Sequence, residues 1–222
     1  MPRFNLVIFD CDGVLVDSER ITNRVFADML NEIGLPVTIE DMFEQFVGKS
    51  MGQCLELMTS LLGAQPPEDF VDNFKRRTTS ALLAQLAAVP GIESALDQIR
   101  LPYCVASSGD HDKMRTTLGI TQLLPRFDGR LYSVTEVARA KPHPDVFLYA
   151  AEKQAVAPSA CVVIEDTPTG VKAGVAAGMT VYGYAALTPA SRLLEAGAHL
   201  TFTDMACLPS LIERGPNPSI RL

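Results

Sequence analysis

Short apolar runs recur along the chain, and several of them end at a polar residue. They cover residues 4–9, 102–106, 160–164 and 179–184, with a weaker run at residues 130–134. A short apolar run without alternation is typical of a strand buried on both faces, as in a parallel sheet. Helical patterns lie between these runs, at residues 112–118, 145–154 and 169–177. Strands that alternate with helices predict an α/β fold with a doubly wound, Rossmann-like parallel sheet.

The segment from residue 17 to residue 88 breaks this alternation. Apolar residues there recur at helical spacing, for example at Val25, Met29 and Ile33, and strand patterns are scarce. Glycines and a pair of prolines divide the segment. We therefore expect a helical insertion at residues 17–88, while residues 1–16 and 89–222 form the α/β core.

Composition and charge narrow the class of partner. The 222 residues are 47% hydrophobic and 20% charged, as in an ordinary globular enzyme. The formal net charge of −7 disfavours nucleic acid and anionic membranes, yet it is compatible with a small anionic substrate. The 5 cysteines form no CxxC pair, the N-terminus shows no secretory pattern, and no apolar run approaches the ~20 residues of a membrane span. We expect a cytoplasmic protein that acts on a small molecule, and we leave its oligomeric state open.

Polar residues that can carry chemistry follow three of the predicted strands. They are Asp10 and Asp12 after the first strand, Ser107, Ser108 and Gly109 after the second, and Glu165 and Asp166 after the run at residues 160–164, with Lys141 in a proline-flanked loop. Ligands of an open α/β sheet bind at the carboxyl ends of its strands. Four acids and a lysine in one crevice need a cation to join them, and oxygen-only ligands favour a hard ion such as Mg²⁺.

The same residues form four motifs that resemble those of the haloacid dehalogenase-like hydrolases. The motifs are DCDGVLVDS at residues 10–18, Ser107 after an apolar strand, KPHPD at residues 141–145 and EDTPTG at residues 165–170. They occur in the order of that family, and a helical cap after the first motif is typical of the branch that contains phosphatases and β-phosphoglucomutases. The first stretch and the cap are most similar to sugar-phosphate phosphatases of the 6-phosphogluconate phosphatase kind.

This resemblance implies a magnesium-dependent phosphatase that acts on a small phosphorylated metabolite, a sugar or sugar-acid phosphate. Asp10 would attack phosphorus and form an aspartyl-phosphate, and Asp12 would protonate the leaving alcohol and later activate water. Lys141 and Ser107 would bind the phosphoryl group and offset its charge.

The resemblance also implies a set of ligands. Mg²⁺ would be held by Asp10, Asp12 (through its carbonyl), Glu165 and Asp166. The substrate would be bound by Ser108 and Gly109 in the core, through their amides, and by Lys49 and Ser50 in the cap, which is expected to select the substrate. Whether Lys49 faces the site or is a solvated residue at a helix start is open.

Two other functions are weighed against this one. A phosphosugar mutase shares the fold and the nucleophile, but the related mutases carry a histidine where this chain has Thr22, and an arginine where it has Met51. These departures favour water as the phosphoryl acceptor. A non-catalytic phosphate-binding regulatory protein is the further alternative, and the intact pair of Asp10 and Asp12 argues against it. A calcium loop does not fit, because Val14 and Ile21 stand where that loop needs oxygen ligands.

Overall fold

The computed structural model describes residues 4–38, 41–42, 45–46 and 51–215. The chain divides into two compact units. One unit comprises Met1–Asp17 and Ala87–Leu222, and the other is the intervening segment Ser18–Leu86. Each unit is described by itself.

The first unit is built on a 6-stranded sheet in which all neighbouring strands are parallel. The strands are β1 (Leu6–Phe9), β2 (Tyr103–Ser107), β3 (Leu131–Ser133), β4 (Cys161–Glu165), β5 (Thr180–Tyr184) and β6 (Leu200–Phe202). Their order is β3-β2-β1-β4-β5-β6. The order reverses direction between β1 and β4, and this switch point is where open α/β sheets bind ligands.

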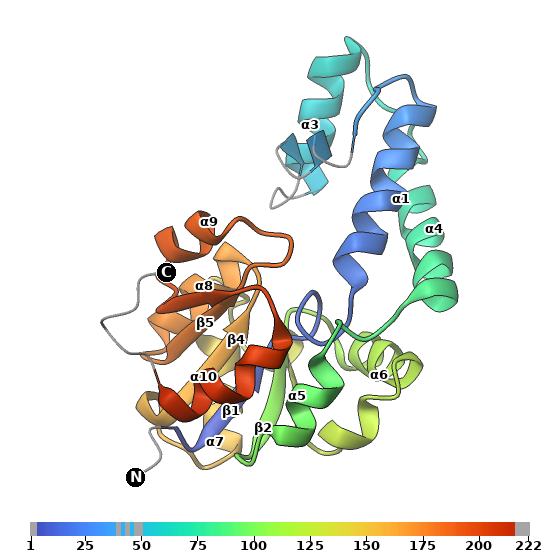
Figure 1. Ribbon diagram of the computed structural model, residues 1–222. Helices are drawn as coiled ribbons and strands as arrows, with labels where there is room; N and C mark the ends of the chain where they lie inside the picture. The colour runs from blue at the N-terminus through green and yellow to red at the C-terminus, as the bar shows by residue number, and fades with distance from the viewer. Residues whose placement is uncertain (1–3, 39–40, 43–44, 47–50, 216–222) are drawn as a thin grey trace. The chain divides into compact units, whose positions relative to one another are not determined.

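Helices cover both faces of this sheet (Figure 1). The helices of this unit are α5 (Ile92–Gln98), α6 (His111–Ile120), α7 (Asp145–Lys153), α8 (Pro168–Ala176), α9 (Ala190–Glu195) and α10 (Leu208–Arg214). Within the described residues, 3₁₀ turns lie between helices and strands: η1 (Leu124–Phe127), η2 (Val134–Glu136), η3 (Pro158–Ala160) and η4 (Met205–Cys207). Helices α7, α8 and α9 pack on one face, and α5 and α10 pack together on the other.

The core of this unit explains why the strands are continuously apolar. Leu6 and Ile8 of β1 contribute to a buried cluster with residues of α7 and α8 such as Phe147 and Val171. Val7 and Phe9 of β1 point to the opposite face and are also fully buried. Because both faces of β1 are covered, every residue of the strand is apolar, as parallel strands require.

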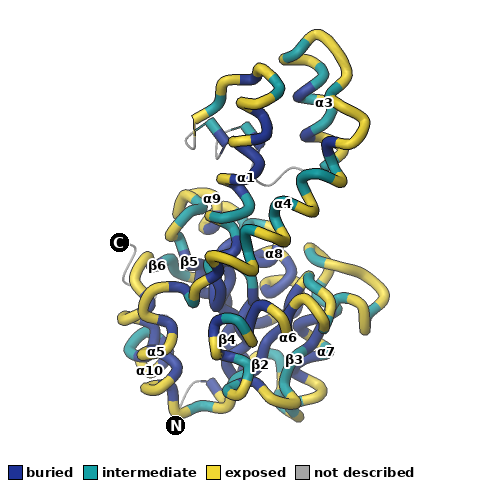
Figure 2. Tube along the Cα trace, turned by 90° about the vertical axis from the view of Figure 1, so that its right-hand side faces the viewer, coloured by how far each residue is buried: buried dark blue, intermediate teal, exposed yellow. Residues whose placement is uncertain are grey.

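The second unit is helical. Its described helices are α1 (Ser18–Glu32), α3 (Met51–Leu62) and α4 (Phe70–Gln85). Phe26 lies at the centre of the unit, with ring centroids 5.6 Å from Phe46, 5.7 Å from Phe70 and 4.9 Å from Phe74. Figure 2 shows the buried positions of α1 alternating with exposed ones, as in an amphipathic helix.

The predicted fold class, a doubly wound parallel α/β sheet, is confirmed. All five predicted strands are present, and the sequence analysis missed only the short edge strand β6 among the strands described. Within the described residues, no helix is long and apolar enough to cross a membrane.

Candidate active site

The nucleophile candidate Asp10 lies at the carboxyl end of the central strand β1. Its amide donates to the carbonyl of Ile164 in β4 at 3.0 Å, which continues the sheet by one residue. The chain then turns tightly, since Gly13 N donates to Val16 O at 2.8 Å and Gly13 has a φ of 78°. This left-handed backbone favours glycine, and it returns the chain toward the sheet.

Lys141 joins this carboxylate to a second one. Its Nζ donates to Asp10 Oδ1 at 2.5 Å, to Glu165 Oε1 at 2.8 Å and to the carbonyl of Ala106 at 3.1 Å. The exposed fractions of the side chains are 4% for Lys141, 10% for Asp10 and 1% for Glu165. Lys141 is therefore a buried cation with its donors occupied, and it draws the ends of β1, β2 and β4 together.

Burial and charge act in opposite directions on this pair. Burial raises the pKa of Asp10 to about 7, with a further rise from Glu165, although the charge of Lys141 works against that rise. Burial lowers the pKa of Lys141, but the carboxylates of Asp10 and Glu165 outweigh burial and hold the pKa above its usual range. Lys141 is therefore a cation at neutral pH, whereas the carboxyl group of Asp10 titrates close to neutral pH.

Glu165 is fixed by contacts on both of its oxygens. Oε1 accepts from Lys141, while Oε2 accepts from Thr167 N and Thr167 Oγ1, each at 2.9 Å. A Cβ on Gly170 would lie 1.6 Å from Glu165 Oε1, so the carboxylate occupies the space that a side chain would take at residue 170. Both oxygens of Glu165 therefore have partners within the protein, Lys141 on one side and Thr167 on the other.

Asp166 lies against the turn that follows Asp10. It is buried, with 6% of its surface exposed, and a Cβ on Gly13 would lie 2.0 Å from Asp166 Oδ2. Only glycine lets this carboxylate come so close to the backbone that follows Asp12. The described residues contain no group of three or more His, Cys, Asp or Glu side chains that could hold a metal ion by themselves. Two carboxylates and a backbone carbonyl are a smaller set of oxygen donors, and such a set suits Mg²⁺, which keeps several waters.

Ser107 ends β2 and is buried, with 1% exposed. Its Oγ accepts from Gly109 N at 3.0 Å, and Ser133 Oγ donates to Gly109 O at 2.8 Å. The Gly109 amide, expected to bind substrate, is therefore used inside the turn. Ser107 keeps its own hydroxyl proton for donation, and Ser108 is exposed.

Lys113 was missed by the sequence analysis. Its Nζ donates to Asp12 Oδ2 at 2.6 Å. Burial lowers the pKa of Lys113, but the charge of Asp12 and this hydrogen bond raise it overall. No motif spacing indicated this contact. The only signal is Asp110, which caps α6 by accepting from Lys113 N at 2.7 Å and so fixes the start of the helix.

The two cap residues expected to bind substrate, Lys49 and Ser50, lie outside the described residues.

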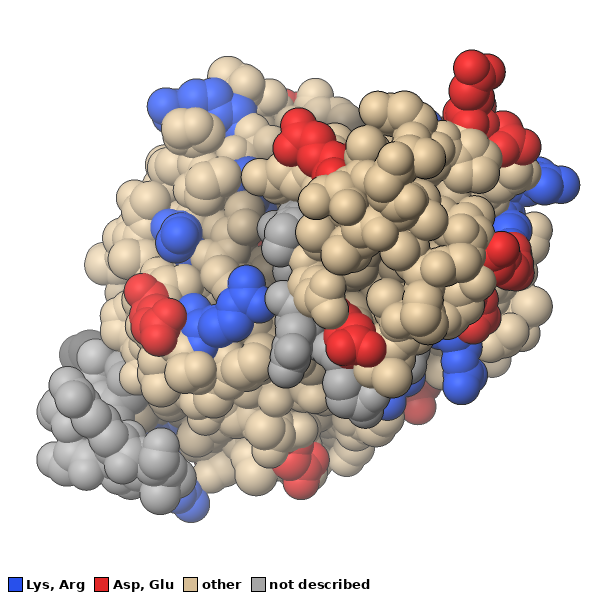
Figure 3. Space-filling model, turned by 90° about the horizontal axis from the view of Figure 1, so that it is seen from above, with Lys and Arg blue, Asp and Glu red and all other residues tan. Residues whose placement is uncertain are grey.

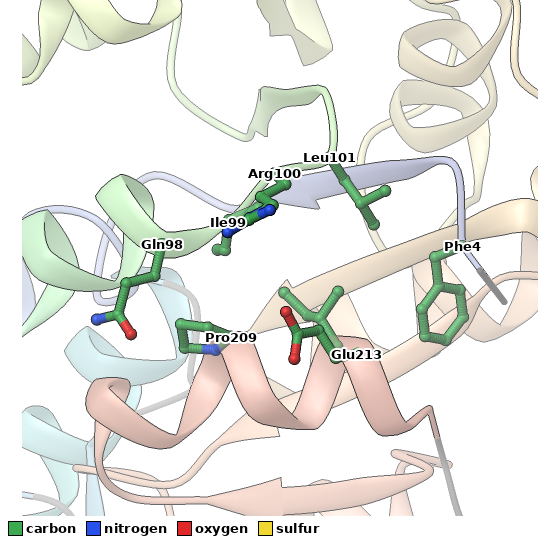
Figure 4. A pocket seen from close by; sticks show the side chains of 8 residues that line it. Phe4, Gln98, Ile99, Arg100, Leu101, Pro209 and Glu213 are labelled. Carbon is green, nitrogen blue, oxygen red and sulfur yellow. The ribbon is translucent and has the colours of Figure 1, made fainter.

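A separate cavity of about 190 Å³ lies between α5 and α10 near the start of β2 (Figure 4). It is lined by Phe4, Gln98, Ile99, Arg100, Leu101, Pro209, Ile212 and Glu213, none of which is a candidate site residue.

Charged side chains of both signs share the surface seen in Figure 3, and neither sign covers that face among the described residues.

A doubly wound sheet whose carboxyl edge holds a buried carboxylate–lysine network, with a second acid two residues after the first, defines a hydrolase core of the haloacid dehalogenase type. The comparisons with known proteins agree. Residues 7–184 match the model of the haloacid dehalogenase-like hydrolase family. The chain belongs to this family, as its motifs predicted.

Individual relatives narrow the class further. The 6-phosphogluconate phosphatase of Escherichia coli strain K12 is 31% identical over 212 residues, which cover 95% of this chain and 96% of that protein. A haloacid dehalogenase family hydrolase from Deinococcus radiodurans R1, solved with bound phosphate and sodium, is 31% identical with a TM-score of 0.87, covering 99% of this chain and 100% of that one. A proposed β-phosphoglucomutase from Thermotoga maritima is 27% identical with a TM-score of 0.78, covering 95% and 99%. The predicted enzyme class, a phosphatase, is confirmed.

Proposed function

We propose that this chain is a magnesium-dependent phosphatase that hydrolyses a small sugar or sugar-acid phosphate through a phosphorylated Asp10. The observation that carries the proposal is the buried pair of Asp10 and Lys141 at the switch point of the sheet. The 6-phosphogluconate phosphatase among its relatives supports the substrate class, and the phosphate bound to the Deinococcus radiodurans relative supports a phosphoryl site.

In the first step, Asp10 Oδ attacks phosphorus, so that a new O–P bond forms while the ester O–P bond breaks. Asp12 gives a proton to the leaving oxygen. In the second step Asp12 takes a proton from water, which attacks the phosphoaspartate and releases phosphate. Lys141 and the hydroxyl of Ser107 would stabilise the negative charge that develops on the phosphoryl oxygens.

The residues present fit a magnesium ion. Asp10, Asp166 and the carbonyl of Asp12 would hold it, and it would supply positive charge that offsets the repulsion between Asp10 and the phosphate. Glu165 has a different role in this proposal, because it orients Lys141 instead of binding the ion.

The helical insertion is proposed as the cap that selects the substrate, with Lys49 and Ser50 as its candidate contacts. The compact helical unit, Ser18–Leu86, agrees with an insertion that folds around its own core.

The proposal is tested with a panel of phosphorylated metabolites, assayed for phosphate release with Mg²⁺ and with excess chelator. Hydrolysis of sugar phosphates that requires Mg²⁺ is expected. Full activity in chelator would contradict the metal assignment, and no release from any phosphate ester would contradict the function.

A mutase is the second candidate, since a proposed β-phosphoglucomutase shares the fold. Incubation with β-glucose 1-phosphate, Mg²⁺ and a bisphosphate primer separates the two functions. We expect free phosphate or no reaction, whereas efficient formation of glucose 6-phosphate would identify a mutase.

A further inference from the structure

A lysine of α6 reaches the second carboxylate of the loop that follows β1. Lys113 Nζ donates to Asp12 Oδ2 at 2.6 Å, and the side chain of Asp12 is only 18% exposed. The side chain of Lys113 is 46% exposed, so this ion pair lies nearer to solvent than the pair of Lys141 and Asp10. A fully solvated ion pair would carry little weight, but the partner here is the proposed proton donor of the reaction.

Several contacts fix the position from which Lys113 acts. Asp110 Oδ1 accepts from the Lys113 amide at 2.7 Å and so sets the first turn of α6. The loop before the helix is held from β3, because Ser133 Oγ donates to Gly109 O at 2.8 Å. A Cβ on Gly109 would lie 3.1 Å from Lys113 Cδ, so the stem of the lysine packs along this loop. The ammonium group of Lys113 therefore reaches Asp12 from a segment that these hydrogen bonds hold in place.

We propose that Lys113 is a positioning residue, which holds the carboxyl group of Asp12 in the orientation that proton transfer to the leaving oxygen requires. This inference rests on the proposed phosphatase function. A charge-assisted hydrogen bond to one carboxyl oxygen restricts rotation of the side chain, and orientation is a large part of the efficiency of a proton donor. Lys141 does not take this role, because it binds Asp10, Glu165 and the carbonyl of Ala106. Lys113 keeps its own protons throughout, and the proton that moves is that of Asp12.

The test compares two substrates that differ in their need for a proton donor. 4-Nitrophenyl phosphate releases a stable phenolate without protonation, whereas a sugar phosphate releases an alkoxide that must be protonated. In Lys113→Met we expect kcat for the sugar phosphate to fall about 10-fold or more, a part of the ~10²–10⁴ that general acid catalysis contributes. kcat for the aryl phosphate should fall much less. KM for both should stay near the wild-type values, because Lys141 and Ser107 are unchanged.

Two further variants complete the design. Lys113→Arg should restore most of the lost sugar-phosphate turnover, because it keeps the cation and its donors. Arg115→Met removes an exposed cation from the same helix and should change neither rate. Thermal melting of each variant confirms that it is folded. An equal loss on both substrates, or no loss on either, would overturn the positioning role. A wild-type protein that hydrolyses neither substrate with Mg²⁺ would instead overturn the proposed function, and this inference with it.

Discussion

Replacing Gly170 with alanine tests the geometry on which the site depends. The added Cβ would lie 1.6 Å from Glu165 Oε1, 1.9 Å from its Cδ and 2.4 Å from Oε2. All three distances are far below an ordinary van der Waals contact, and the obstacle is a carboxylate held on both oxygens. The carboxylate must move by more than an ångström, and this movement breaks its bonds to Lys141 and Thr167, which are 2.8–2.9 Å long.

The size of the effect on stability and rate follows from the contact that Lys141 would lose. Lys141 is 4% exposed and would lose one of its two carboxylate partners. Removing one partner of a buried ion pair destabilises a protein by about 3 kcal/mol or more. The gain in helix propensity from Gly to Ala is only about 0.5–1 kcal/mol. We expect the melting temperature to fall by roughly 4–10 °C for a chain of this size. We expect kcat to fall by about 10²–10³-fold, as for other losses of a charge-stabilising group in a closed site.

The assay measures phosphate release and thermal melting for Gly170→Ala beside a matched control, Gly119→Ala. Gly119 lies in α6, and a Cβ there would meet nothing within 4 Å, so this variant should keep its activity and its stability. Wild-type kcat and melting temperature in Gly170→Ala would show that Glu165 does not occupy the space beside residue 170, and that it does not orient Lys141.

Other predictions address the nucleophile, the cation and the metal. Asp10→Asn should abolish turnover of an aryl phosphate while the protein stays folded, because a neutral amide does not attack phosphorus; residual turnover near the wild-type rate would exclude Asp10 as the nucleophile. Lys141→Met should lower kcat about 10²-fold or more through lost charge stabilisation, measured by steady-state phosphate release, and an unaffected rate would remove it from the mechanism. Asp166→Ala should raise the Mg²⁺ concentration needed for half-maximal activity, whereas an unchanged requirement would place the ion elsewhere. Because the pKa of Asp10 is raised from 3.8 to about 7, the folded metal-free protein keeps a proton that the unfolded chain has lost, so its stability should fall as pH rises from about 4 to about 7 and level off above that. Mg²⁺ binds the carboxylate form, so it should raise the melting temperature more at pH 8 than at pH 6; an equal rise at both would contradict this linkage.

The strands were predictable because parallel strands are buried on both faces and must be apolar throughout. The elements that were missed are those with too few residues to show a period. Strand β6 has only 3 residues, and they are partly exposed. Helices α5, α9 and α10 have 7, 6 and 7 residues, which is about two turns or less. At Gly174 of α8, a Cβ would lie 2.7 Å from Val181 of β5, so the absence of a side chain lets this helix pack closely on the sheet. At Gly170 of the same helix, a Cβ would meet the carboxylate of Glu165, the last residue of β4.

The residues that gather at the site were predictable for a similar reason, but their pairing was not. Asp10, Ser107 and Glu165 lie at the carboxyl ends of buried strands, and the order of the sheet brings those strand ends together. Which oxygen of Glu165 binds Lys141 depends on the turn at Thr167 and on the space left beside Gly170, which has no side chain. These contacts join atoms across the folded chain, so the sequence pattern alone does not determine them.

The charges of the site show why the second lysine matters. Asp10, Asp12, Glu165 and Asp166 bring four carboxylates to one edge of the sheet, and Lys141 alone would leave three negative charges there. The contact of Lys113 with Asp12 reduces this excess to two, which a single Mg²⁺ balances. Without the ion, the raised pKa of Asp10 lets protonation relieve part of the same excess. The two lysines also contact different acids. Lys141 is buried against Asp10, the proposed nucleophile, while the more exposed Lys113 contacts Asp12, the proposed proton donor. With the ion bound these charges cancel, so a phosphate ester enters a site that no longer carries the excess negative charge that would repel it.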